Sequence, residues 1–258
     1  MKLCRFELLD SPGQIRTGIV RGPKLYETDG ATPVGVHEAS AARLLAPIGR
    51  PPSVRWFFGP GFETGGPIVS YGNPSSVIGP NMIVPWPGFS GNLDVEMYLA
   101  IVIGGQGSNI PVELADEAVL GFMVACSLVA RDAEREERTA QTGPGRSRDV
   151  AIAVGPALTT PEELDDLAEN TPAGRRYNLG AAMRINGVEA RRGSACELPW
   201  TPAQAIATAS ESAPLATGDL LLLGPIPRAA DPARRLEPGD EIACAIDHLG
   251  ALALKVAP

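Results

Sequence analysis

The sequence is poor in the residues that most often bind transition metals. Its 258 residues include two histidines, His37 and His248, and four cysteines, no two of which have a CxxC spacing. This pattern argues against the common zinc motifs, in which cysteine and histidine ligands recur at short spacings. We therefore expect reduced thiols in a cytoplasmic protein.

The chain also lacks the features of nucleic-acid and membrane partners. Its net charge is −8, and it has no long basic cluster, so neither nucleic acid nor an anionic membrane is expected as a partner. No apolar run approaches the ~20 residues of a membrane span, and residues 1–7 lack a signal-peptide core. The glycine-rich segment 59–66 matches neither a P-loop nor a GxGxxG motif.

Turn-forming residues are plentiful, with 29 glycines and 25 prolines. They favour a β-rich fold with many turns. The length allows one large domain, or a large one with a small one. We expect a small N-terminal domain at 1–50, with short strands at 3–9 and 18–20 and a short helix at 39–45. A proline-rich linker at 45–52 leads into a main domain at 51–258.

Hydrophobic runs and turn signals predict the elements of this main domain. Strands are expected at 53–58, 122–130, 150–158, 220–223, 241–246 and 250–256. A helix is expected at 111–120, and capping boxes at Thr160 and Thr201 begin two more. Asn186-Gly187 predicts a β-hairpin with a type I′ turn. Residues 134–138, of mixed charge, are expected to be exposed.

The most informative stretch is the strand expected at 93–104. Side chains alternate along a strand, so Asp94, Glu96 and Tyr98 share one face beside an apolar wall. Two neighbouring carboxylates repel, and burying them costs several kcal/mol unless something compensates. A hard divalent cation such as Mg²⁺ would do so. The alternative is that this polar end of the strand lies in water.

Two further polar sites are open to a functional and an ordinary interpretation. Asp132 follows the buried strand at 122–130 and is a natural third metal ligand, or else forms an ion pair with Arg131 or another base. His37-Glu38 could be a proton-transfer dyad, or an ordinary surface pair.

An ordered set of motifs resembles the fumarylacetoacetate hydrolase family. In chain order they are Pro74–Gly79, the Glu96 strand ending Val102-Ile103-Gly104, Ala130–Asp132, Gly145–Ser147, Asn186-Gly187, Thr217–Leu220 with Leu223-Gly224, and Glu237–Asp240. The resemblance implies a mainly β (α+β) fold: a mixed β-sandwich roll with a small N-terminal β domain, usually a homodimer. It also implies Mg²⁺ or Mn²⁺ chemistry on small oxo acids, by C–C hydrolysis, decarboxylation or enol–keto isomerisation.

The resemblance implies metal ligands at Glu96 and Asp132. The family usually has two ligands on this strand. When Val102-Ile103-Gly104 are aligned with the family motif, the second of them falls on Tyr98, whose neutral phenol is a poor Mg²⁺ ligand. A two-residue slip places Asp94 there instead. The family's Gly-Lys-Ser lysine is Arg146 here, which can clamp a carboxylate but cannot shuttle protons. The expected substrate-binding residues are Arg146, Ser75, Ser76 and Tyr98.

The chain departs from the family where a lid carries a His-Glu pair that activates water. The corresponding segment, Phe57–Glu63, has no histidine, and Glu63 is the only acid nearby. The Gly-Thr-Pro after the late strand is Gly224-Pro225-Ile226-Pro227, which removes a substrate-binding hydroxyl. Without the pair and the lid, efficient hydrolysis is not expected.

These departures predict an enzyme that stabilises an enolate of a small oxo acid or β-dicarbonyl compound, by isomerisation, decarboxylation or cyclisation. The expected catalytic residues are Arg146, Glu63 and Glu134. The alternative is a non-catalytic descendant that serves as a binding or scaffold protein.

If Asp94 and Glu96 repel each other, we expect Glu96→Gln to stabilise the metal-free protein, because it removes one of the two charges.

Overall fold

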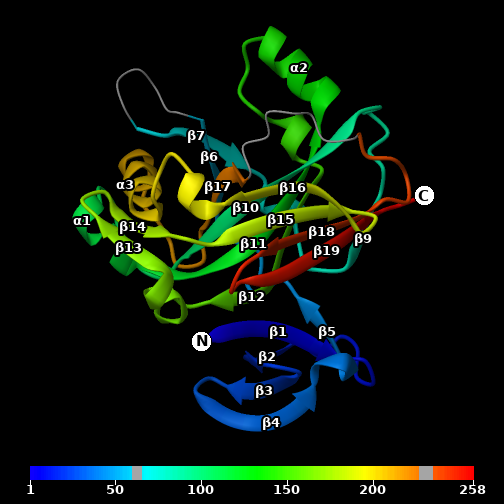
Figure 1. The fold of residues 1–258 in the computed structure, drawn as a ribbon, viewed down its shortest axis with the longest axis vertical. Helices are drawn as coiled ribbons and strands as arrows, with labels where there is room; N and C mark the ends of the chain where they lie inside the picture. Colours follow the sequence, from blue (N-terminus) through cyan, green and yellow to red (C-terminus); the bar gives the residue numbers. More distant parts are fainter. Residues whose placement is uncertain (60–65, 227–234) are drawn as a thin grey trace.

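The computed structural model describes residues 1–59, 66–226 and 235–258. Strands predominate in these residues, as expected (Figure 1). They form a twelve-stranded sheet, a five-stranded sheet and a two-stranded ribbon. In this described part of the chain no helix is long and apolar enough to cross a membrane.

The twelve-stranded sheet joins the N-terminal strands to the core of the protein. Its strands are β1 Lys2–Leu8, β2 Arg16–Arg21, β3 Lys24–Asp29, β4 Thr32–Glu38, β5 Ala42–Leu45, β6 Val54–Phe58, β7 Ile68–Gly72, β8 Val77–Ile78, β10 Leu93–Ile103, β11 Val119–Ala130, β12 Ala151–Thr159 and β17 Leu220–Ile226. The main order is β4-β3-β2-β1-β12-β11-β10-β17-β6-β7, with β5 paired to β1 and β8 to β12.

The N-terminal strands lie together at one end of the molecule, drawn in blue in Figure 1. They have a small core of Cys4, Phe6 and Leu25. Hydrogen bonds between β1 and β12 continue the sheet into the rest of the chain, so the boundary at residue 50 stays a prediction. The helix predicted at 39–45 is wrong. Only Ala39–Ala41 form a 3₁₀ turn, η1, because Ala42–Leu45 pair with β1 as β5.

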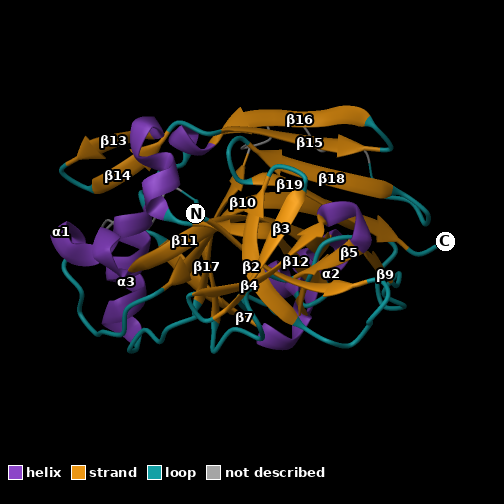
Figure 2. Cartoon of the chain, turned by 90° about the horizontal axis from the view of Figure 1, so that it is seen from below, coloured by secondary structure: helices purple, strands orange, loops and turns teal. Residues whose placement is uncertain are grey.

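The five-stranded sheet forms a second layer beside the large one, as Figure 2 shows. Its strands are β9 Met82–Val84, β15 Gly180–Ile185, β16 Val188–Ser194, β18 Glu241–Ile246 and β19 Gly250–Val256, in the order β16-β15-β18-β19-β9. The predicted hairpin is confirmed. Asn186 and Gly187 have φ values of 51° and 78°, as a type I′ turn requires. The ribbon pairs β13 Ala168–Thr171 with β14 Gly174–Tyr177.

In the described residues, helices are few and short. They are α1 Val112–Ala115, α2 Arg131–Thr139 and α3 Pro202–Ser212, with further 3₁₀ turns η2 Pro74–Ser76, η3 Asp116–Ala118, η4 Arg146–Arg148, η5 Pro161–Leu167 and η6 Ala195–Glu197. The capping box at Thr201 is confirmed, whereas Thr160 makes no side-chain cap and precedes a 3₁₀ helix. The helix predicted at 111–120 ends early, because Val119 already pairs with Ile103 across the sheet.

Strand β10 separates two hydrophobic clusters. Val95 and Met97 contribute to a cluster shared with Cys244 and Leu252 of the five-stranded sheet. Tyr98 lies on the opposite face, in a cluster with Trp56. The predicted alternation is therefore confirmed, and the polar residues at the start of β10 lie on the Tyr98 face.

Candidate active site around Glu96 and Arg148

Three segments position the charged groups around Glu96. Glu96 itself lies on β10 and is 5% exposed. Arg131 begins α2 directly after β11, and the pairing of Leu93 with Ala130 places it beside the start of β10. Arg148 ends the η4 turn and is also buried. The polar end of β10 therefore does not simply lie in water.

Arg148 bonds to three side chains of this group. Its Nη1 lies 2.5 Å from Glu96 Oε2 and 2.8 Å from the Tyr98 hydroxyl oxygen. Its Nη2 lies 2.9 Å from Glu134 Oε1. The guanidinium carbon is 4.7 Å from the ring centroid of Phe58, a distance at which a cation is attracted to the ring face. The side chain is thus fixed by charge and by aromatic packing.

Arg131 completes the enclosure of the carboxylates. Its Nη2 lies 2.7 Å from both Asp94 Oδ2 and Glu96 Oε1, and its Nη1 lies 2.7 Å from Glu134 Oε2. Arg191 adds a contact of 3.3 Å to Asp94 Oδ1. We call the whole set the Glu96 network: Asp94, Glu96, Tyr98, Arg131, Glu134, Arg148 and Arg191. Its formal charges balance, because three guanidinium groups face three carboxylates.

The network fixes the protonation states at its centre. Burial alone would raise the pKa of Glu96, but the charge and hydrogen bonds of Arg148 and the charge of Arg131 outweigh it and lower this pKa to about 2. Burial and the charge of Glu96 raise the pKa of Tyr98 well above its ordinary value. At neutral pH, Glu96 is therefore an anion, and Tyr98 is a neutral donor that bonds to it.

The residues present do not fit the divalent cation that the resemblance implies. Both oxygens of Glu96 already accept hydrogen bonds from guanidinium groups. The position directly across from Glu96 on β11 is the neutral, fully buried Ser127. Among the described residues no group of three or more His, Cys, Asp or Glu side chains could hold a metal ion.

Asp132, the predicted third ligand, makes different contacts. Its Oδ1 accepts a hydrogen bond of 2.6 Å from Ser90 Oγ, and its Oδ2 accepts one of 2.8 Å from the Gly91 N–H. These bonds join the start of α2 to the segment before β10. The predicted ligand set of Asp94, Glu96 and Asp132 is therefore not assembled.

The predicted carboxylate clamp, Arg146, also lies away from the Glu96 network. Its guanidinium carbon stands 4.0 Å from the centroid of Phe89, beside a cavity of about 230 Å³ that Asp132, Glu136 and Glu137 also line. Sequence reasoning missed Arg148. The arginines at both ends of Arg146-Ser147-Arg148 were a signal that could have suggested it, but the motif pointed to the first.

A cavity of about 220 Å³ adjoins the Glu96 network. It is lined by Tyr71, Gly72, Asn73, Gly145, Arg148 and Asp149. We call it the Arg148–Asp149 cavity. Asn73 Nδ2 lies 3.2 Å from one oxygen of Asp149, and the Ser76 hydroxyl donates to the other. The Nε–H of Arg148 is buried and has no partner among the described residues.

Some of the predicted site residues thus come together and others do not. Tyr98 and Glu134 belong to the Glu96 network, and Ser76 bonds to a residue of the cavity. The Ser75 N–H donates to the Asn73 side chain, which fixes the loop there. Glu63 lies outside the described residues.

Neither histidine lines the Arg148–Asp149 cavity. His37 Nε2 lies 2.7 Å from Glu27 in the N-terminal strands, so its partner is not Glu38. His248 lies in the turn between β18 and β19.

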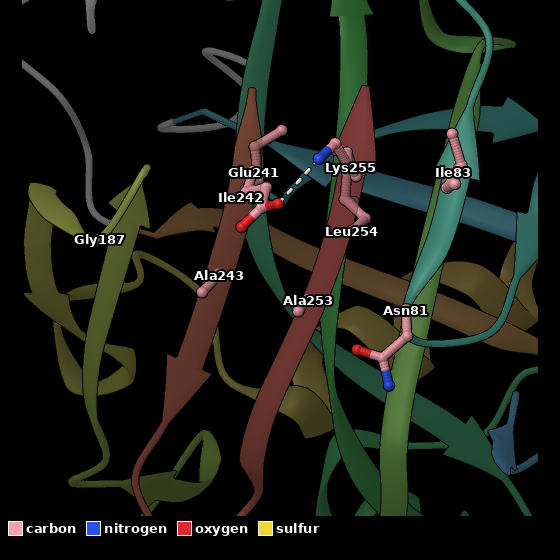
Figure 3. Close-up of a pocket in the computed structure, with 9 residues that line it drawn as sticks. All are labelled: Asn81, Ile83, Gly187, Glu241, Ile242, Ala243, Ala253, Leu254 and Lys255. Carbon is pink, nitrogen blue, oxygen red and sulfur yellow. Dashed lines mark hydrogen bonds and ion pairs between the residues drawn. The ribbon is translucent and has the colours of Figure 1, made fainter. Parts of the chain in front are cut away.

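Another cavity, of about 340 Å³, lies on the five-stranded sheet (Figure 3). Figure 3 shows Glu241 and Lys255 pointing toward one another from β18 and β19. Lys255 Nζ lies 2.9 Å from Glu241 Oε1. Ala243 and Ala253 also line this cavity. Because the two charged groups pair with each other, this cavity offers less for acid–base chemistry than the Arg148–Asp149 cavity.

Comparison with known families identifies the family to which the chain belongs. The model of the fumarylacetoacetate hydrolase C-terminal domain matches residues 60–257. The chain belongs to the fumarylacetoacetate hydrolase family. The fold agrees with this membership, since the matched residues include strands of both the twelve-stranded and the five-stranded sheet.

Curated members of the family resemble this chain over most of its length. The mitochondrial oxaloacetate tautomerase of Xenopus laevis is 33% identical over 189 residues, which cover 72% of this chain and 56% of that protein. A human mitochondrial oxaloacetate tautomerase is 32% identical over 193 residues, which cover 74% of this chain and 59% of that protein. The chain therefore matches little more than half the length of these relatives.

Solved structures of the family share the fold along the whole chain. A 5-carboxymethyl-2-hydroxymuconate delta-isomerase from Mycobacterium smegmatis aligns with a TM-score of 0.81 and 23% identity, and covers 100% of this chain and 98% of its own. A fumarylacetoacetate hydrolase from Exiguobacterium antarcticum aligns with a TM-score of 0.80 and 24% identity, and covers 100% and 99%. At these identities the likeness establishes the fold.

Proposed function

We propose that this family member isomerises a small oxo acid between its keto and enol forms in the Arg148–Asp149 cavity. The observation that carries the proposal is the position of Arg148. This buried guanidinium belongs to the Glu96 network and also lines the cavity. Its Nε–H, like that of Arg191, is buried without a partner among the described residues.

An anionic ligand in the cavity would be attracted to this guanidinium. An enolate or carboxylate oxygen suits a guanidinium, which keeps its charge at every working pH. A fixed positive charge at the developing enolate oxygen lowers the barrier to enolisation. The cavity of about 220 Å³ suits a ligand of a few carbon atoms.

Proton transfer requires a base beside the guanidinium. Asp149 lines the same cavity, and Asn73 and Ser76 hold both of its oxygens. In the proposed step, Asp149 takes the proton from the carbon next to the carbonyl, and the carboxylic acid so formed returns that proton to the enolate oxygen. Glu134, predicted as a base from sequence, is instead ion-paired with both Arg131 and Arg148.

The curated relatives support isomerisation rather than hydrolysis, since two of them are named oxaloacetate tautomerases. The structural neighbours include both a named isomerase and a named hydrolase. Water activation would need a further base, and neither histidine lines the cavity. Decarboxylation and cyclisation share the enolate and stay open. The homodimer and the cytoplasmic location also stay predictions.

The test is an assay of enol–keto exchange of oxaloacetate, with acylpyruvate hydrolysis measured beside it. We expect acceleration of the exchange and little hydrolysis. Asp149→Asn should slow the exchange at least tenfold, whereas the matched variant Asp165→Asn should not, because Asp165 pairs with Arg175 outside the cavity. Brisk hydrolysis without exchange would contradict the proposal.

A second candidate function is supported by the charge balance of the Glu96 network. Because its three arginines and three carboxylates satisfy one another, the network can serve as a structural element in a non-catalytic binding protein. In that case oxaloacetate or a stable analogue binds, or nothing binds, and no exchange is accelerated.

A further inference from the structure

We propose that the guanidinium groups of Arg131 and Arg148 supply the positive charge that balances Glu96 in the Glu96 network. This chain then binds no divalent metal ion at Glu96. The inference concerns the charge that holds Glu96 in the fold. It does not depend on the reaction in the neighbouring cavity, and its test measures metal binding and stability.

The first argument is the occupancy of the Glu96 carboxylate. A carboxylate has about four lone-pair sites on its two oxygens. Oε1 accepts from Arg131 at 2.7 Å and from Arg148 Nη2 at 3.4 Å. Oε2 accepts from Arg148 Nη1 at 2.5 Å and from the Tyr98 hydroxyl. All the sites at which a cation would bind are therefore used.

The second argument is the chemistry of the neighbouring positions. Mg²⁺ is held by hard oxygen ligands, chiefly carboxylates, together with water. Tyr98, two residues along the strand, is a neutral donor, and Ser127, directly opposite on β11, carries no charge. Asp94 is bound by Arg131 and Arg191. One carboxylate without a free oxygen does not make a site for a divalent ion.

The third argument is electrostatic. The Glu96 network has no net formal charge, and two of its guanidinium groups lie within 2.7 Å of Glu96 oxygens. A divalent cation at this place would face two like charges in a site from which water is largely excluded. Arginine cannot lose its proton to make room, and Phe58 and Trp56 flank the Arg148 guanidinium.

The direct test is a titration of the purified, chelator-treated protein with Mn²⁺. Electron paramagnetic resonance measures the free ion, and thermal unfolding is recorded with Mg²⁺, Mn²⁺ or chelator. We expect no stoichiometric binding that depends on Glu96 and the same unfolding midpoint in all three conditions. One Mn²⁺ bound per chain, and lost in Glu96→Gln, would overturn the inference.

A second pair of variants tests whether the guanidinium occupies the position of a cation. Ser127→Asp combined with Arg148→Met removes one guanidinium and adds a carboxylate opposite Glu96. Ser127→Asn with Arg148→Met is the matched control of nearly equal size. We expect Mn²⁺ to raise the unfolding midpoint of the Asp variant more than that of the Asn variant. An equal response of the two would contradict the inference.

Discussion

Glu96 Oε2 lies 2.5 Å from Arg148 Nη1, and the two side chains are only 6% and 8% exposed. This pair joins the central strand β10 to the η4 turn, whose neighbours Gly145 and Asp149 line the cavity. The contact that stabilises the fold therefore also fixes the position of the group proposed to bind substrate.

Replacing Glu96 with glutamine should destabilise the protein. Glutamine leaves Arg131 and Arg148 facing each other without the charge between them, and breaking a buried ion pair costs about 3–5 kcal/mol. The sequence alone suggested stabilisation, through relief of repulsion from Asp94. Urea unfolding measures the difference. Glu189→Gln is the control, because its pair with Arg192 is exposed to solvent and its loss should change the stability little.

Stability should depend on the titration of Glu96 at acid pH. Its pKa is lowered from the ordinary 4.5 to about 2. The stabilisation is therefore complete above pH 4.5 and is lost as the pH falls from there toward 2, and it amounts to something on the order of 3 kcal/mol. The free energy of unfolding of the wild type should fall more steeply over this interval than that of Glu96→Gln. Parallel curves would refute the assignment.

The Tyr98 hydroxyl should contribute to the low pKa of Glu96. Its hydrogen bond is one of the contacts that lower this pKa. Tyr98→Phe keeps the aromatic contact with Trp56 and removes the donor, so we expect a loss of about 1–3 kcal/mol. The acid-induced fall in stability should also be smaller and end at a higher pH, because the folded-state pKa of Glu96 moves toward its ordinary value. A variant as stable as the wild type would show that the hydroxyl makes no net contribution.

Arginine at position 148 should matter more than arginine at position 146. Arg148→Lys keeps the charge but loses the forked geometry that reaches Glu96, Glu134 and Tyr98. We expect it to reduce kcat/KM for the oxo acid at least tenfold. Arg146→Lys tests the assignment made from sequence, since Arg146 stacks on Phe89. A larger loss in Arg146→Lys would restore that assignment.

Much of the fold could be predicted because its signals are local. The alternation along β10, the Asn186-Gly187 turn and the capping box at Thr201 each depend on a few adjacent residues. The helix expected at 39–45 failed because its register with β1 is a long-range pairing. Such a pairing overrides local propensity and cannot be seen in one short segment.

The site was predictable only in part, for a similar reason. The shared face of Asp94, Glu96 and Tyr98 follows from strand geometry, whereas their partners come from α2, η4 and β16. The sequence showed the carboxylates and the need for a positive charge, and a metal ion was the natural source. That the charge comes from Arg131 and Arg148 depends on tertiary contacts over 35 and 52 positions.

The measurement that most directly tests the account is the rate of enol–keto exchange of oxaloacetate in the presence of a chelator. Buffer without protein, with and without Mg²⁺, gives the background rate. We predict that the chelator-treated protein accelerates the exchange, that added Mg²⁺ brings no further protein-dependent gain, and that Asp149→Asn loses at least nine-tenths of the effect. Acceleration that appears only after Mg²⁺ is added, or none under either condition, would contradict the account.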